Sequence, residues 1–304
     1  MANICSRNSV KDAVKEPLIL NLLNILQKIG SESTEENKKK AQNEMINMDD
    51  IIVDFVEKPD LENAVLIEGL PGVGNVGKLA VEHLIDEIDA KQFAEIHSLY
   101  FPPQVLVDEN GLSKLVNNRL YYKKDVGLDD VDLVFLTGDY QGMTPQGQYQ
   151  LTDKILSVAK ELGVETVFSL GGYSHGDIVD KPEVLGAATT SEKIEEMEEL
   201  GVKFSEEHPS SGIIGASGLL LGLGEKLYDI IGVCLMGETS GYFVDPGAAR
   251  AVLKKLMKYL GEEISYEKLD EKAEEVEELT SKVKDMGGMQ QQQEAGSEDL
   301  SYIG

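Results

Sequence analysis

"AVLIEGLPGVGNVGKLAVEHLIDEI", residues 64–88, reads as a buried strand, a glycine-rich turn and an amphipathic helix in succession. A continuous apolar run that ends in glycines is typical of a strand covered on both faces, as in a parallel sheet. After the turn, Leu79, His83, Leu84 and Ile88 recur at helical spacing. The stretch therefore predicts an α/β fold.

The same alternation continues on both sides of this stretch. Strand-like runs occupy residues 51–57, 95–101, 131–139, 165–173 and 230–242, and helical patterns occupy 149–164 and 245–263. Strands that alternate with helices favour one α/β domain with a largely parallel sheet. In such folds the functional loops follow the carboxyl ends of the strands. Here those loops are "GLPGVGN" (69–75), "TGDYQG" (137–142), "GGYSHG" (171–176) and "GETSGY" (237–242).

Composition restricts the function classes. The chain has 304 residues and a formal net charge of −27, which argues against nucleic acid as a partner because phosphate backbones are bound by clustered Lys and Arg. An acidic surface favours basic or mixed-charge partners instead. No apolar run approaches the roughly 20 residues that span a bilayer, so no membrane partner is expected. The two cysteines are far apart in sequence, as is typical of a reducing cytoplasm.

The glycine-rich turn partly matches two phosphate-binding motifs. Gly72, Gly74 and Gly77 spell the G-x-G-x-x-G of dinucleotide sites, and with Lys78 they give the first seven positions of a P-loop. The eighth position needs a hydroxyl for Mg²⁺, and Leu79 cannot supply it. The alternative is that the glycines allow a tight strand-to-helix turn and close packing, with Asn75 capping the helix. We favour the turn and keep an anion or nucleotide loop at Gly72, Gly74, Asn75, Gly77 and Lys78 as the alternative.

No complete catalytic set is evident in the sequence. Gly215-Ala216-Ser217-Gly218 resembles a nucleophile elbow, but nothing ties a histidine to Ser217, and a closely packed helix start explains the glycines equally well. Glu238 is a candidate general base, although a lone acid in a loop is more often a hydrogen-bond anchor. The sequence shows no metal-ligand cluster and no pair of carboxylates. We expect no enzyme activity, no metal and no cofactor.

The two ends of the chain differ from the centre. Residues 1–50 read as an extension with an amphipathic helix and a polar linker. Residues 262–286 are strongly helix-forming, and residues 287–304 read as a disordered tail that ends in "LSYIG". Steps of four and three, typical of a short coiled-coil seam, separate Leu269, Ala273, Val276, Thr280 and Val283. A solvated helix that folds back on its own domain is the other interpretation of this region.

Residues 51–260 resemble the archaeal branch of the proteasome-assembly chaperone family. The blocks that carry the resemblance occur in the right order and are "LIEGLPGVGNVGKLAVEHLI", "FPPQVLV", "LTGDYQGMTPQGQY", "SLGGYSHG", "GAATT", "GIIGASGLLLGLG" and "CLMGETSGYFVDPGAA". The resemblance implies a three-layer α/β/α domain at residues 51–261, similar to the nucleoside-phosphorylase type. It also implies an ATP-independent, cytoplasmic chaperone that forms homo-oligomers and engages the 20S proteasome α ring or its α subunits.

The family also suggests a role for the end of the chain. Proteasome activators insert C-terminal tails between α subunits through a hydrophobic-tyrosine-any motif. This chain departs from that pattern, since Tyr302 is third from the end and Ile303 takes the tyrosine place. We expect Tyr302, Ile303 and the Gly304 carboxylate to dock on the α ring. The alternative function is a nucleotide-dependent enzyme, an ATPase or an ATP-grasp-like ligase as some members have been labelled, that uses the loop 72–78.

Overall fold

An eight-stranded sheet forms the centre of the chain in the computed structural model, which describes residues 50–174, 176–177, 179, 181–204 and 212–276. The strands follow the order β1 (Ile51–Phe55), β3 (Lys91–Ser98), β6 (Asn118–Val126), β7 (Val131–Gly138), β2 (Ala64–Glu68), β8 (Val164–Ser174), β10 (Ile231–Thr239) and β9 (Val184–Ala188). The neighbours β7, β2, β8 and β10 are parallel, which confirms the predicted parallel sheet. The flanking pairs are antiparallel.

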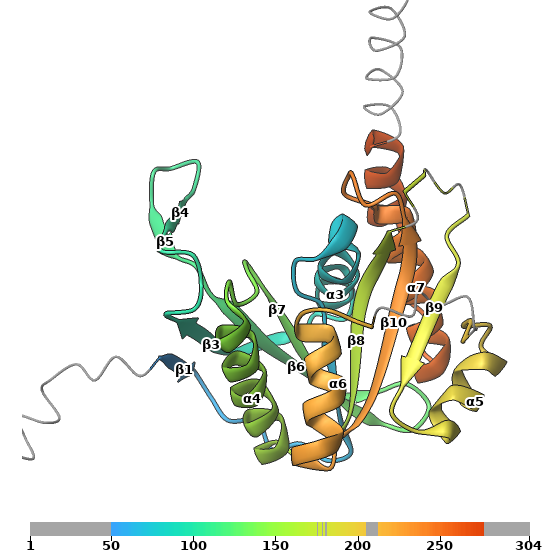
Figure 1. Cartoon of the computed structure of the whole chain (residues 1–304), viewed down its shortest axis with the longest axis horizontal. Helices are drawn as coiled ribbons and strands as arrows, with labels where there is room; N and C mark the ends of the chain where they lie inside the picture. The colour runs from blue at the N-terminus through green and yellow to red at the C-terminus, as the bar shows by residue number, and fades with distance from the viewer. Residues whose placement is uncertain (1–49, 175, 178, 180, 205–211, 277–304) are drawn as a thin grey trace, which may run out of the picture. The chain divides into compact units, whose positions relative to one another are not determined.

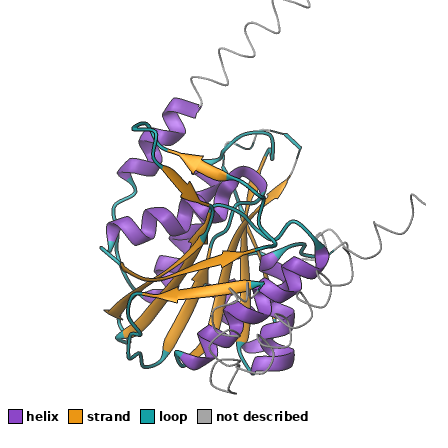
Figure 2. Ribbon diagram, turned by 90° about the vertical axis from the view of Figure 1, so that its left-hand side faces the viewer, coloured by secondary structure: helices purple, strands orange, loops and turns teal. Residues whose placement is uncertain are grey.

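Helices cover both faces of this sheet. On the face turned to the viewer in Figure 1 lie α4 (Pro145–Glu161) and α6 (Ala216–Leu223). On the other face, α3 (Val76–Glu87) packs beside α7 (Pro246–Leu260), and α5 (Ser191–Glu199) contacts β9. The view in Figure 2 shows the strands between two layers of helices. The predicted three-layer α/β/α arrangement is therefore confirmed.

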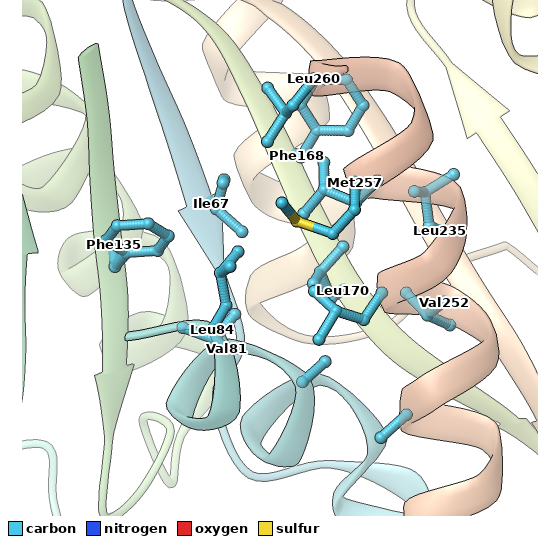
Figure 3. Close-up of a cluster of buried hydrophobic side chains, with 14 of the residues drawn as sticks. Ile67, Val81, Leu84, Phe135, Phe168, Leu170, Leu235, Val252, Met257 and Leu260 are labelled. Atoms are coloured by element: carbon cyan, nitrogen blue, oxygen red, sulfur yellow. The ribbon is translucent and has the colours of Figure 1, made fainter. Parts of the chain in front are cut away.

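Each face of the sheet carries its own hydrophobic core. On the α3/α7 side, apolar residues of the four parallel strands meet apolar residues of the two helices (Figure 3). The labelled members of this cluster are Ile67, Phe135, Phe168, Leu170 and Leu235 from the strands, and Val81, Leu84, Val252, Met257 and Leu260 from the helices. Because the central strands bury both faces, their sequences are continuous apolar runs rather than alternating ones.

Two of the long helices begin at a capping side chain, and α4 begins at Pro145, four residues before the predicted start at 149. The side chain of Asp245 accepts a 2.9 Å hydrogen bond from the backbone N–H of Ala248, and Pro246 follows at the first helical position. Thr144 likewise accepts from the backbone N–H of Gly147 at the start of α4. Both side chains satisfy a backbone donor that the helix itself leaves unpaired.

A small hairpin was not predicted. Strands β4 (Val105–Val107) and β5 (Ser113–Leu115) pair only with each other in the described chain, and every residue in them is exposed. The periodicity of so short a segment carries little signal.

The chain that follows α7 folds back on its own domain. Residues 267–276 are helical, and Leu269 is only 1% exposed in the same core as α3 and α7. Ser265 accepts a hydrogen bond at its carbonyl oxygen from His83 of α3, over 2.7 Å, and Asp270 pairs with Arg250 of α7 at 3.0 Å. Leu269 thus packs against its own domain and is not exposed as part of a coiled-coil seam. Thr280, Val283 and the N-terminal extension lie outside the described residues.

Candidate functional site

A cavity of about 780 Å³ lies at the carboxyl end of β8, between α6 and strands β10 and β9. It receives residues from three of the loops that the sequence placed at strand ends, among them Gly72, Gln141 and Tyr173. Ser217 of α6 and Met236 of β10 complete its walls. The strand-end location agrees with the general rule for open α/β sheets.

Missing side chains create this space. A methyl group on Gly171 would come no closer than 4.0 Å to another atom, the Ser217 Oγ, and one on Gly222 would meet nothing within 4 Å. Both glycines line the cavity. The backbone could therefore accommodate a larger residue at both positions.

Other glycines near the cavity serve close packing. A methyl group on Gly77 would overlap the carbonyl oxygen of Leu170, and one on Gly172 would overlap that of Val73. Helix α3 and the turn before it thus lie directly against β8. This geometry confirms that the glycines permit a tight turn and close packing.

The five residues of the glycine loop do not converge on one point. Gly72 and Gly77 line the cavity, whereas the Lys78 Nζ pairs with Glu82 at 3.7 Å. Gly74 has the positive φ of 61° that glycine tolerates, and Asn75 has a φ of 51°. The interpretation of Asn75 as a capping side chain is wrong, because it makes no capping hydrogen bond from this left-handed conformation.

A buried acid lies below the cavity. Glu68, at the end of β2, is 1% exposed and accepts hydrogen bonds from the Leu70 N–H at 2.9 Å, the Ser169 hydroxyl at 2.5 Å and the Ser217 hydroxyl at 3.4 Å. Loss of solvation raises the pKa of its carboxyl group above the ordinary range and favours the uncharged form. Burial also raises the pKa of the Cys234 thiol beside it to about 12.

Sequence reasoning missed Glu68. The available signal was an acid at the end of the apolar run "AVLIE", directly before the glycine turn. A charged residue type in an otherwise buried strand needs partners or a shifted pKa.

No histidine of the described chain reaches Ser217. The His83 side chain bonds the carbonyl of Ser265, and the His97 Nε2 lies 3.5 Å from Glu95 on β3. Ser217 hydrogen-bonds the acid Glu68 without an intervening base, so this part of the chain forms no serine triad. Glu238 accepts a hydrogen bond from the Glu183 N–H, which is the anchoring role considered above.

The described residues provide neither a metal-binding cluster nor a membrane-spanning helix. No group of three or more His, Cys, Asp or Glu side chains there could hold a metal ion. No helix there is long and apolar enough to cross a membrane. Tyr302, Ile303 and Gly304 lie outside the described residues.

The fold and cavity define an α/β/α protein with a mixed sheet and an apolar, glycine-walled site. Residues 66–284 match the PAC2 family, and the chain belongs to that family. A curated relative, "Uncharacterized protein MJ1210" of Methanocaldococcus jannaschii, is 39% identical over 80% of this chain and 93% of its own length.

Two solved structures are similar over most of the chain. PbaB of Pyrococcus furiosus, described as an archaeal proteasome activator, is 39% identical with a TM-score of 0.73, covering 78% of this chain and all of that one. PbaA of the same organism, an archaeal homolog of proteasome-assembly chaperone, is 31% identical with a TM-score of 0.63, covering 83% and 99%.

Proposed function

We propose that this protein is a non-enzymatic, ATP-independent chaperone or binding protein of the cytoplasm that engages the α ring of the 20S proteasome or its α-subunit assembly intermediates. The observation that carries the proposal is the similarity to PbaB, an archaeal proteasome activator, along nearly the whole folded domain. PbaA, a homolog of proteasome-assembly chaperone, supports the same assignment.

The chemistry of the site supports a binding role. In the described chain Ser217 has no histidine partner, and its hydroxyl group hydrogen-bonds the buried Glu68, whose pKa is raised. A hydrolase of the serine type needs a base that takes the proton of the nucleophile. The acidic chain, with a net charge of −27, is suited to partners that present basic or mixed charge.

We place part of the contact in the C-terminal tail, at Tyr302, Ile303 and the Gly304 carboxylate. A disordered tail of this length, which we expect of residues 287–304, has a root-mean-square reach of roughly 20–25 Å. Several tails of one homo-oligomer could therefore occupy several pockets of one ring, and linked weak contacts act together as a tight one.

A pull-down with the cognate 20S particle tests the tail. The full chain should be retained, and a chain that ends at Asp299 should be retained much less. Tyr302→Ala and Ile303→Ala should each weaken retention, whereas the neighbouring Ser301→Ala serves as the matched control and should not. One alanine added after Gly304 keeps every side chain and displaces only the carboxylate. Equal retention of all these chains would refute tail docking.

The oligomer is a separate part of the proposal and rests on the helix-forming segment up to residue 286. A chain that ends at Val276 keeps Leu269 in the core and removes the seam positions Thr280 and Val283. Sedimentation should show a smaller assembly for this chain than for the full one. An unchanged assembly mass would mean that residues after 276 do not hold the oligomer together.

Equilibrium binding of ATP, ADP and NAD tests the rival enzyme. We expect no Mg²⁺-dependent binding in the micromolar range, because Lys78 already pairs with Glu82. Micromolar binding that Lys78→Ala abolishes would favour a nucleotide-dependent enzyme over the chaperone.

A further inference from the structure

The described residues that line the cavity between α6 and the sheet include no charged side chain. Charged residues make up 27% of the chain, yet its lining consists of glycine, aliphatic, hydroxyl, amide and sulfur-containing residues. A site for an anion or a cation would present a side chain of the opposite charge. This lining presents neither sign.

The acidic groups of Glu68 and Cys234, next to Ser217 and in the cavity wall, both favour their uncharged forms. Glu68 hydrogen-bonds the lining residue Ser217, and desolvation raises the pKa of its carboxyl group. The thiol of Cys234, which lines the cavity, is kept protonated by the same burial. An ionic ligand would have to give up its hydration without receiving a counter-charge from these groups.

Most polar atoms of the wall already have partners within the protein. The side-chain amide of Gln141 donates to the Pro71 carbonyl and accepts from the Ala216 N–H. Thr189 accepts from the Gly232 N–H. The Ser217 hydroxyl donates to Glu68 over a long 3.4 Å, and its lone pairs remain able to accept a hydrogen bond from a ligand.

We propose that this cavity binds a neutral, largely apolar small molecule whose one polar group hydrogen-bonds the hydroxyl of Ser217. Its volume of about 780 Å³ lies within the range of about 300–1,000 Å³ that accommodates such ligands. The site is independent of the proteasome contact, which we place in the tail.

Ligand titrations that follow the NMR signal of a methyl group in the cavity wall test the proposal. Met236 lines the wall, so the full chain labelled with ¹³C-methyl methionine reports occupancy at this position. Phenol and benzene, which are neutral, should shift the Met236 signal saturably. Benzoate, an anion of similar size, should leave it unchanged at the same concentration. Equal binding of benzoate, or no saturable shift with either neutral probe, would overturn the proposal.

Gly171→Val places a side chain inside the cavity, beside Ser217. The new Cβ lies 4.0 Å from the nearest atom, and a β-branched residue suits a strand, so the melting temperature should be retained. Binding of both neutral probes should be weakened. Ser113→Val, which adds the same side chain to the exposed strand β5, is the control and should bind both. If Gly171→Val fails to fold, Gly222→Val at the helical wall, where a methyl group meets nothing, takes its place. Undiminished binding of the neutral probes to a folded Gly171→Val or Gly222→Val chain would refute the assignment.

Ser217→Ala separates the hydrogen bond from the apolar contacts. This substitution should weaken the affinity for phenol by about three- to tenfold, as is usual for one lost hydrogen bond. The affinity for benzene should not change. An equal effect on both probes would contradict the role of the hydroxyl.

Discussion

The hydroxyl group of Ser169 on β8 donates a 2.5 Å hydrogen bond to the buried carboxyl group of Glu68 at the end of β2. The same carboxyl group accepts from Ser217 at the start of α6 and from the backbone of Leu70 in the glycine turn. One buried acid therefore links two central strands, the turn and a helix, directly below the cavity.

This acid makes stability depend on pH. The pKa of Glu68 is raised above 4.5 by desolvation, so the folded chain holds this proton to a higher pH than the unfolded chain does. Stability from this group is fully present below pH 4.5 and falls as pH rises toward the folded pKa, by at most about 1.4 kcal/mol per pH unit. Glu68→Gln replaces the ionisable carboxyl group with a neutral amide. The decline of stability with pH that arises from this group should therefore disappear.

Urea unfolding between pH 4 and 8 measures the effect. As pH rises, the free energy of unfolding of Glu68→Gln should increase relative to that of the natural chain. Glu165→Gln, on an exposed position of the same strand β8, should give no such trend. A difference between Glu68→Gln and the natural chain that is constant with pH would contradict the account.

Two glycines of one turn should respond differently to alanine. Gly77→Ala should destabilise the protein by about 1–3 kcal/mol, because the added methyl group overlaps the Leu170 carbonyl. Gly72→Ala should be nearly neutral, since Gly72 is extended with a φ of −156° and the nearest atom to the methyl would be 3.9 Å away. Chemical denaturation checks both, and similar losses at the two positions would contradict the close packing of α3 on β8.

The segment after α7 should contribute to the stability of its own domain. Leu269→Ala should cost about 2–5 kcal/mol, because the side chain is buried against the α3/α7 core. Glu271→Ala, two residues away and exposed, should change stability little. Thermal unfolding of the two variants measures the contrast. A cost at Leu269 no larger than that at Glu271 would indicate a helix that does not pack on the domain.

The layers of the fold were predictable because three of the four central strands, β2, β7 and β10, are apolar runs followed by glycine and a helical pattern. The antiparallel flanks were not, since pairing direction depends on partners distant in sequence. The exposed hairpin at residues 105–115 escaped for a similar reason. Its strands are too short to show a period.

The site was predictable only in part. Three of its loops were expected at strand ends, and the close packing of Gly77 followed from the residue type. The role of Glu68 and the space beside Gly171 depend on which side chains the fold brings together, and no local pattern reports that.

Sedimentation velocity of the labelled full chain with the cognate 20S particle, without nucleotide and with EDTA present, tests the central claim most directly. The account predicts that label sediments with the 20S particle, that unlabelled chain displaces it, and that ATP with Mg²⁺ changes neither result. Two results would contradict the account: a labelled chain that sediments at the rate of the free protein at every 20S concentration, and a labelled chain that associates with the particle only when ATP is added.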